Sequence, residues 1–442
     1  MKIGIIGAGI SGLVAARLLA GKHDVTLFEA ADYVGGHTHT VDVASDDGPL
    51  AIDTGFIVYN ERTYPAFCGL LDELNVETQP TSMSFGVRCD RCGLEYSGSS
   101  LRGLAARWRN LASPAFHRML VDILRFNSAR WSAPGTYREE LTVGEFLLEG
   151  GYSKGFAEHY LLPMGGAIWS CPMETFGAFP MRFILEFYRN HGLMQITDRP
   201  VWRVIRGGSR SYVDRLIDPF RDRIRLRSPV SSVRRKVEGI EVSVGGSCEQ
   251  FDELVFACHS DQALRMLESP DHLERSLLGA FPYGDNTALL HTDVSVLPRR
   301  RAAWSSWNYR VPASSEARPR VTYLMNMLQG LPGETIYCVS LNEEDEIDPA
   351  KVLGTYRYSH PVFTLERAAA QSRHRELIRR DRISYCGAYW GNGFHEDGVQ
   401  SALAVTREFG IVPRWGEAGP ERVAADEGRL TGPRRPEVNH AG

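Results

Sequence analysis

The sequence lacks any run of 18 uncharged apolar residues in its 442 positions, so no membrane-spanning helix is expected. Cysteine is scarce, and the eight present are scattered along the chain. That usage favours free thiols in a reducing, cytoplasmic compartment over a disulfide framework. The net charge of −4 creates no field that would recruit nucleic acid. No internal repeat is visible, and the apolar start of the chain is not followed by the small-residue cleavage site of a signal peptide.

A second Cys-x-x-Cys pair is also missing. The single one, Cys89 to Cys92, lies between two strand-like runs, Met83 to Arg88 and Leu94 to Tyr96. A zinc ribbon requires two such pairs. We therefore interpret this one as the tip of a hairpin, with a metal site and a redox disulfide as the alternatives.

What the sequence has is a dinucleotide fingerprint at its start. Gly7, Gly9 and Gly12 form a Gly-x-Gly-x-x-Gly motif that includes Ser11, follows an apolar strand and opens a helix. Glu29 ends the next strand, 22 residues after Gly7. In this βαβ context the glycines permit a tight turn, close approach of a pyrophosphate and close packing of helix on strand. The acid would accept hydrogen bonds from ribose hydroxyls, and the helix N-terminus would face the phosphates.

The segments that follow decide between cofactors. Gly35-Gly36-His37 comes soon after Glu29, and Asp53-Thr54-Gly55-Phe56 lies on a strand and loop. Together with the first motif these resemble the FAD site of the amine oxidase and phytoene desaturase superfamily, which implies FAD as the cofactor. The sequence shows no match to a Cys or His motif for covalent flavin attachment, so we expect the FAD to be non-covalent. The usual arginine after the glycine pair is His37, which titrates near ~6.5. We therefore expect backbone N–H groups to hold most of the pyrophosphate.

A third segment, Tyr385 to Ala404, resembles the C-terminal flavin motif of the same superfamily. The resemblance places Gly398 and Val399 at the N-terminus of a helix that faces the flavin ring, where the helix dipole stabilises negative charge. It also matches Val230 to the strand that reads adenine. The predicted cofactor contacts are Gly7, Gly9, Ser11, Gly12, Glu29, Gly36, His37, Asp53, Gly55, Phe56, Val230, Gly387, Glu396, Asp397, Gly398 and Val399.

The middle of the chain resembles a narrower family. The matching stretches include LPMGGAIWSCP from Leu161, RPVWRVIRGGSRSYV from Arg199 and YSHPVF from Tyr358. They resemble bacterial FAD-dependent proteins similar to the N-terminal flavin domain of plant cyclopropane fatty-acid synthases. The resemblance implies removal of two hydrogens from a methylated, unsaturated phospholipid acyl chain to give a diene, in furan or methyl-branched fatty acid synthesis. It also implies a cyclopropane-synthase-like methyltransferase as a partner.

Such a reaction requires an apolar slot beside the flavin and a proton acceptor within reach. Aromatic residues between positions 164 and 323 could build the slot, although an ordinary aromatic core explains each of them as well. Glu396, His395 and Tyr323 are the candidate catalytic residues, with Tyr59 and His191 as weaker ones. Glu396 and His395 have a helix-capping role as their alternative.

The segment from Leu101 to Trp131 is rich in arginine, with Asp122 as its one acid. A basic amphipathic helix that bears tryptophan is attracted to an anionic bilayer. The alternative is a solvated face over the core. We expect peripheral contact at the inner face of the membrane.

The predicted fold is α/β, with an FAD-binding Rossmann-like domain of the amine oxidase type and a discontinuous α+β substrate domain. The first domain is expected from residues 1–80, 200–265 and 376–409, the second from 81–199 and 266–375, and a disordered tail from 410–442. An amine oxidase, and a flavin-bound scaffold for the methyltransferase without turnover, are the rival functions.

Overall fold

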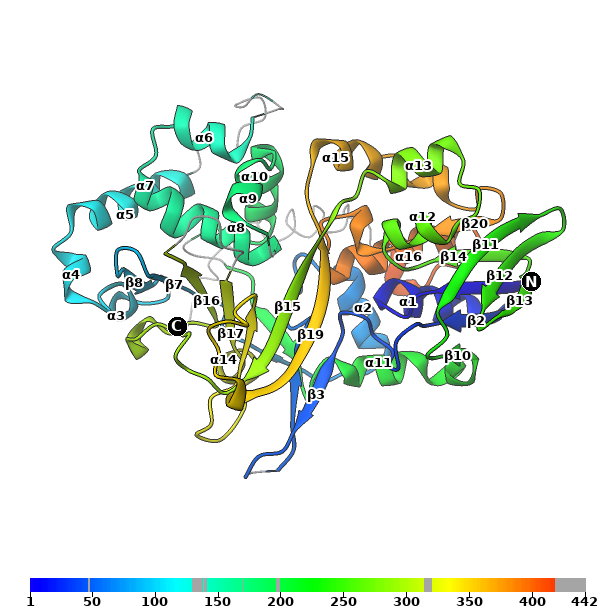
Figure 1. Cartoon of the computed structure of the whole chain (residues 1–442), viewed down its shortest axis with the longest axis horizontal. Coiled ribbons are helices and arrows are strands. Elements are labelled where there is room, and N and C mark those ends of the chain that lie inside the picture. Colours follow the sequence, from blue (N-terminus) through cyan, green and yellow to red (C-terminus); the bar gives the residue numbers. More distant parts are fainter. Residues whose placement is uncertain are drawn as a thin grey trace, which may run out of the picture.

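The computed structural model describes residues 1–46, 48–128, 138, 141–169, 171–195, 199–313 and 320–417. It has two sheet-centred units that lie side by side (Figure 1). The first is a five-stranded parallel sheet in the order β10-β2-β1-β14-β20. Its strands are β1 (Lys2–Ile6), β2 (Asp24–Phe28), β10 (Ile224–Arg225), β14 (Glu253–Phe256) and β20 (Ile383–Tyr385).

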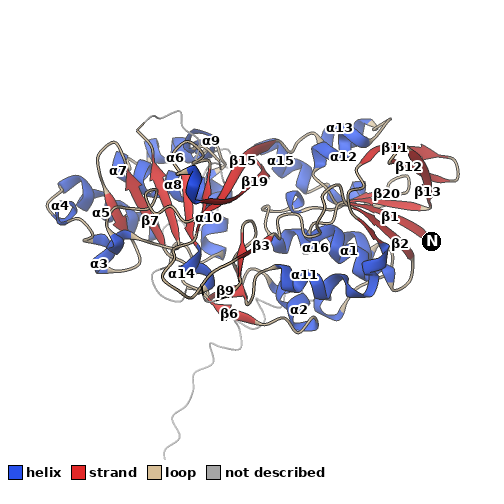
Figure 2. Ribbon diagram, turned by 60° about the horizontal axis from the view of Figure 1, so that its bottom comes forward, coloured by secondary structure: helices blue, strands red, loops and turns tan. Residues whose placement is uncertain are grey.

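The parallel sheet is covered on both faces because its strands are apolar on both sides. Ile3, Ile5 and Val255 face helices, which are α1 (Ile10–Ala20), α2 (Pro65–Glu73), α11 (Arg210–Ile217) and α16 (His395–Arg407). Leu254 and Phe256 face an antiparallel sheet of β11 (Val230–Lys236), β12 (Gly239–Val244) and β13 (Ser247–Phe251). Figure 2 shows α1 and α16 side by side on the helical face. The parallel sheet thus lies between a layer of helices and a second sheet, and the α/β fold class is confirmed.

The second unit is a seven-stranded sheet in the order β19-β15-β18-β17-β16-β7-β8, antiparallel except where β16 pairs with β7. Its strands are β7 (Phe85–Cys89), β8 (Glu95–Ser97), β15 (Tyr283–His291), β16 (Trp307–Val311), β17 (Arg320–Leu324), β18 (Cys338–Leu341) and β19 (Val352–Pro361). Figure 1 shows β15 and β19 between the two units. The chain enters each unit more than once, as predicted in outline, while the proposed domain boundaries stay a prediction.

Helices pack on the seven-stranded sheet through an aromatic core that includes Phe126, Phe156, Phe176 and Tyr309. They are α5 (Pro114–Asn127), α6 (Val143–Glu149), α7 (Lys154–Phe156), a π-helix η2 (Ala157–Leu161), α8 (Leu162–Trp169), α9 (Met173–Gly177) and α10 (Met181–Asn190), preceded by α3 (Leu101–Leu104) and α4 (Trp108–Leu111). The Ser113 side chain caps α5 by accepting from the Phe116 N–H.

Smaller elements connect the units. They are β3 (Thr40–Val43), β4 (Leu50–Asp53), β5 (Tyr59–Asn60), β6 (Thr78–Pro80), β9 (Trp202–Ile205), α12 (Ser260–Met266), α13 (His272–Leu278), α14 (Met325–Gln329) and α15 (Leu365–Gln371). The hairpin expected at Cys89 to Cys92 is present between β7 and β8. Within the described residues, no helix is long and apolar enough to cross a bilayer.

The prediction of a disordered tail from residue 410 is wrong for its first residues. Trp415 packs on α2 where Gly69 leaves room, because a Cβ at Gly69 would lie 2.5 Å from the Trp415 Cβ. The indole Nε1 of Trp415 also donates to Glu73 at 2.8 Å. Residues 418–442 lie outside the described part of the chain.

Candidate functional site

A cavity of about 900 Å³ lies between the two units. From the parallel-sheet unit, its wall takes the glycine turn after β1, the end of β2, the loop of residues 35–37 and the segment from Gly387 to His395. From the other unit it takes β19 and a set of apolar side chains. We call the first part, together with β19, the nucleotide side, and we call the set of apolar side chains the apolar side.

The nucleotide side is built so that no side chain fills the space before α1. No side chain caps this helix at Gly9, so its first N–H groups are available to an anion. A Cβ at Gly9 would meet no protein atom within 4 Å, whereas one at Gly12 would lie 1.9 Å from the Gly7 carbonyl oxygen. Gly36, with φ +59°, packs on Gly9, since its Cβ would lie 3.1 Å from the Gly9 Cα. This cradle fits a pyrophosphate.

Glu29 is positioned at the end of β2 as the fingerprint predicts. Its carboxylate accepts hydrogen bonds from the backbone N–H groups of Ala8 and Ala31, both at 2.8 Å. Val230 lies on the same part of the wall. A carboxylate fixed by two N–H donors beside the glycine turn is suited to accept from ribose hydroxyls. Together with the cradle, these residues fit the adenosine diphosphate part of FAD.

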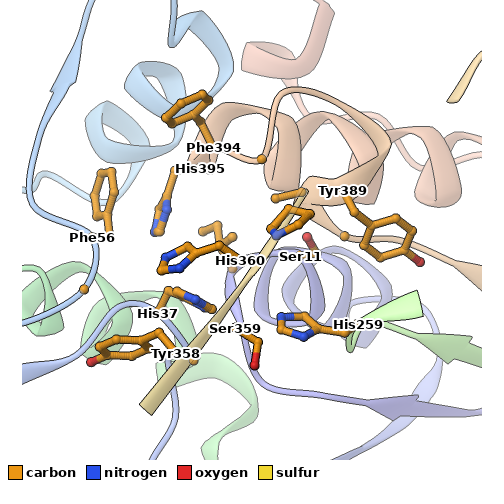
Figure 3. Close-up of a pocket in the computed structure, with 18 of the residues that line it drawn as sticks. Ser11, His37, Phe56, His259, Tyr358, Ser359, His360, Tyr389, Phe394 and His395 are labelled. Carbon is orange, nitrogen blue, oxygen red and sulfur yellow. The ribbon is translucent and has the colours of Figure 1, made fainter. Parts of the chain in front are cut away.

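His37 lies within a histidine cluster that the sequence analysis did not identify. Its ring centroid is 5.3 Å from that of His360, 5.0 Å from that of Tyr358 and 6.1 Å from that of His259 (Figure 3). Burial, and next the neighbouring His360, lower the pKa of His37 well below 6.5. The position where the superfamily has a cation is therefore neutral in this chain. The alternation of Tyr356, Tyr358 and His360 on β19 was a period-two signal that could have revealed the cluster.

His395 and Phe56, both predicted site residues, lie on the wall with stacked rings 3.5 Å apart (Figure 3). The Nε2 of His395 is 2.9 Å from Thr38 Oγ1 and 3.0 Å from Tyr212 Oη. Burial lowers the pKa of His395 to about 3. Two hydroxyl groups thus hold a neutral imidazole in one orientation.

Glu396, the leading candidate for a catalytic base, does not line the cavity, and this prediction is corrected. Its carboxylate accepts from the backbone N–H groups of Ala66 at 3.1 Å and Phe67 at 2.9 Å. Those groups belong to the first turn of α2, where a carboxylate is stabilising. Burial raises the pKa of Glu396, but its role in the structure is to join α16 to α2.

Four other predicted contacts are corrected in the same way. Asp397 caps α16 by accepting from Phe394 N at 2.9 Å. Gly398 and Val399 lie inside α16, where a Cβ at Gly398 would be 2.7 Å from Ile10. The wall at this place ends at His395, because α16 begins there and its next residues turn toward α1 and α2. Gly12 is likewise off the wall and serves the packing of α1 on β1.

Asp53 is the last correction. Its buried carboxylate accepts from Thr40 Oγ1 at 2.6 Å and from Ser209 N and Oγ at 2.9 and 2.8 Å. Burial raises the pKa of Asp53 to about 6. Its neighbours Thr54 and Gly55 reach the wall, and Asp53 lies behind them. It anchors β4 to the start of α11 rather than contacting a cofactor. Ser11, by contrast, reaches the wall, and its hydroxyl donates to Gly398 O at 2.9 Å.

The apolar side carries one titratable base. Its wall residues are Met83, Ile168, Trp169, Phe187, His191, Leu193, Trp202, Trp307, Tyr323, Leu341 and Phe363. His191 stacks on Phe187 at 3.8 Å, and its Nδ1 lies 2.9 Å from the Phe187 carbonyl oxygen. Because a carbonyl only accepts, Nδ1 carries the proton and Nε2 has a free lone pair. Burial lowers the pKa of His191 to about 4, so the ring is neutral near pH 7.

Of the remaining candidates, Tyr323 lines the apolar side, and burial raises its pKa above 10. Tyr59 is buried in the core of the parallel-sheet unit and does not reach the wall. Among the described wall residues, Glu29 is the only carboxylate. The apolar side therefore offers a histidine lone pair and indole N–H groups but no negative charge.

Comparisons with known proteins agree with this geometry. Residues 10–295 match the family model described as flavin containing amine oxidoreductase. The chain is 26% identical over 247 residues to amine oxidase [flavin-containing] A of Bos taurus, a match that covers 54% of the chain and 45% of that protein. The chain thus spans about half the length of this relative.

Solved structures share the fold over nearly their whole length. Cyclohexylamine oxidase from Brevibacterium oxydans has a TM-score of 0.62 at 17% identity, covering 92% of this chain and 99% of its own. The CLA-producing fatty acid isomerase from P. acnes has a TM-score of 0.61 at 18% identity, covering 92% and 98%.

Proposed function

The chain belongs to the family of flavin-containing amine oxidoreductases, and from this premise we propose that it is an FAD-dependent dehydrogenase of a fatty acyl chain. The substrate that fits best is a methylated, unsaturated acyl chain of a membrane phospholipid, which loses two hydrogens to give a conjugated diene. The observation that carries the proposal is the wall of the apolar side, which is aromatic and aliphatic and has no carboxylate among its described residues.

FAD held in the cavity supplies the hydride acceptor. The chain's own residues do the rest. The apolar side, with Trp169, Trp307 and Phe363, binds the acyl chain and excludes water. The proton that leaves from the neighbouring carbon goes to Nε2 of His191, the unprotonated ring nitrogen on this side. The stack on Phe187 and the bond to its carbonyl keep this nitrogen in one position.

The exposed face of α3, α4 and α5 supports a substrate within a membrane. Leu101 is 86% exposed and Trp108 is 73% exposed, and Arg102 and Arg109 lie exposed beside them. Exposed apolar side chains among arginines match an anionic bilayer surface in both chemistry and charge. We propose that this face docks on the membrane that holds the acyl chain. Arg130 and Trp131, also expected here, lie outside the described residues.

Amine oxidation is the second candidate, favoured by the family and by fold neighbours that include cyclohexylamine oxidase. A fold neighbour that is a fatty acid isomerase supports an acyl substrate to a similar degree. The apolar side supports the acyl chain in our proposal, since an ammonium group would find no carboxylate among its described residues. A scaffold that serves a lipid methyltransferase without turnover is the remaining alternative.

The test is anaerobic mixing of the FAD-loaded protein with phospholipid vesicles that contain methylated vaccenyl chains, while the flavin absorbance is followed. Bleaching by the lipid and not by simple amines is expected. Bleaching by amines alone would establish the second candidate, and no bleaching by either would leave the scaffold.

The His191→Gln variant tests the proton acceptor. We expect it to keep FAD and to be reduced about 10²-fold more slowly. His374→Gln is the matched control, because His374 is a half-buried, stacked histidine that is also bonded to a backbone carbonyl, and it is not on the wall. Equal rates in both variants would remove His191 from the mechanism.

A further inference from the structure

Three ligating side chains from distant segments meet at the tip of the β7–β8 hairpin. Cys89 and Cys92 flank the tip, and His159 reaches it from the π-helix η2. Their sulfur and nitrogen atoms all lie within 4.8 Å of one another, and Cys92 Sγ is 3.8 Å from His159 Nε2. The proposed reaction does not use these residues, since none of them lines the cavity.

The backbone around the cysteines aims both sulfur atoms to one side. Gly93 N donates to the Cys89 carbonyl at 2.8 Å, and Cys89 N donates to Leu94 O at 2.8 Å. Gly93 has φ +70°, a left-handed conformation that favours glycine. The turn that results is a short knuckle that brings the two sulfur atoms together.

The histidine is brought to the knuckle by independent contacts. Tyr96 Oη donates to the His159 carbonyl at 2.6 Å. Arg91, inside the knuckle, forms an ion pair with Glu158 at 2.7 Å. The side chain of Arg107 donates to the Gly93 carbonyl from outside the hairpin. The contacts of Tyr96 and Arg91 join η2 to the hairpin, and that of Arg107 joins the hairpin to the segment before α4.

We propose that Cys89, Cys92 and His159 bind a zinc ion. In tetrahedral coordination with Zn–S of ~2.3 Å and Zn–N of ~2.0 Å, a sulfur and a nitrogen ligand lie about 3.5 Å apart and two sulfur ligands about 3.8 Å apart. The separation of 3.8 Å between Cys92 Sγ and His159 Nε2 is within about 0.3 Å of the tetrahedral value. Two thiolates and an imidazole are ligands that zinc prefers, and binding releases the thiol protons to solvent. Because Cys92 is exposed, a water molecule has access to the fourth position.

A bound zinc ion would link the β7–β8 hairpin to the π-helix η2. The π-helix η2 continues directly into α8, and Ile168 and Trp169 at the end of α8 line the apolar side of the cavity. In Figure 1, β7 and β8 lie next to α7 and α8 in the unit away from the N-terminus. Zinc would therefore fix the position of the apolar wall and leave the FAD cradle in the other unit untouched.

The experiment uses the full FAD-loaded chain, purified in buffer with trace zinc and then dialysed without metal. Elemental analysis should give roughly one zinc per chain. Cys92→Ser and His159→Ala should each lower this content about tenfold or more while the flavin content stays at the wild-type level. Cys248→Ser is the matched control, since Cys248 is another exposed, free cysteine in a different sheet, and it should keep the zinc.

A measurement on the wild-type chain keeps the test independent of the folding of the variants. Addition of Cd²⁺ to the metal-stripped protein should produce the ultraviolet charge-transfer band of cadmium–thiolate bonds. No zinc and no such band would overturn the proposal. Loss of two titratable thiols in air, with no metal bound, would overturn it in favour of a redox disulfide between Cys89 and Cys92.

Discussion

Replacement of Gly9 by alanine should separate cofactor binding from folding. The backbone at Gly9 has φ −73° and ψ 177°, which is extended and open to any residue. The new Cβ would meet no protein atom within 4 Å. The cofactor-free variant should therefore be as stable as wild type, or more stable by about 0.4–1 kcal/mol because the unfolded chain loses freedom. The only neighbour of that methyl group would be the pyrophosphate.

The loss in affinity follows from that crowding. Overpacking of one methyl group costs about 1–3 kcal/mol, and each ~1.4 kcal/mol is a factor of ten in the dissociation constant. Gly9→Ala should thus bind FAD about 5- to 150-fold more weakly. The substitution should weaken FAD binding without destabilising the cofactor-free protein, so the thermal midpoint of the cofactor-free protein should not fall.

The assay is titration of the cofactor-free protein with FAD, followed by quenching of flavin fluorescence, next to a thermal melt. Gly21→Ala is the matched control at the other end of α1, where a Cβ would meet only Leu18 O, at 4.0 Å. It should bind FAD like wild type. Gly12→Ala should fail to fold, because its Cβ would lie 1.9 Å from the Gly7 carbonyl oxygen. An unchanged FAD affinity in Gly9→Ala would refute the assignment of the cradle.

Three further outcomes are expected. Glu396→Ala should keep FAD and the wild-type rate of anaerobic flavin reduction. It should lose about 1–3 kcal/mol of stability, because two backbone N–H groups of α2 lose their acceptor. A reduction about 10²-fold slower in a variant that still holds FAD would instead identify Glu396 as the base. Burial lowers the pKa of His395 to about 3 and that of His360 to about 4. Below pH 6.5 the unfolded chain therefore binds more protons than the folded chain. Each of these histidines should reduce the free energy of unfolding of the cofactor-free protein by ~1.4 kcal/mol per pH unit as the pH falls from 6.5 toward its folded-state pKa. Urea melts at pH 7 and pH 5 should show a smaller loss for His395→Gln than for wild type, and equal losses would contradict the direction of the shift. Arg102→Glu with Arg109→Glu should weaken binding to anionic vesicles about 30-fold, at ~1 kcal/mol for each residue, and binding that is insensitive to both the variant and salt would exclude this face.

The nucleotide side could be predicted from sequence because it depends on local geometry. Gly7, Gly9 and Glu29 act through a turn, a helix N-terminus and the end of the adjacent strand, all within one βαβ unit. Such a unit fixes its own backbone, so a spacing in the sequence becomes a distance in space. The chain's return to the same sheet at β14 and β20 was also visible as short apolar runs.

The rest depends on how distant segments dock. The sequence predicts that Glu396 lies near the start of α16, which is correct. The direction of its side chain, however, is set by α2, which lies some 330 residues earlier in the chain. His191 is a stronger candidate for the base than the sequence indicates, because the bond from its Nδ1 to the Phe187 carbonyl leaves Nε2 unprotonated. The third ligand of the cysteine knuckle lies 67 residues from Cys92, which no spacing rule for zinc ribbons covers. Residue identities were informative at these positions, but orientation came from tertiary packing.

The order of strands in the parallel sheet also bears on how the chain is synthesised. β1 pairs with β14, about 250 residues later, and β14 pairs with β20 a further 129 residues on. At a ribosomal rate of ~5–20 residues per second, β14 is synthesised on the order of ten seconds or more after β1, so one edge of β1 has no partner strand during that time. The helix α16 is synthesised later still. The unit that begins the chain is therefore completed last. During translation its apolar strand edges are open to wrong partners, and the seven-stranded sheet can assemble before the cofactor site exists.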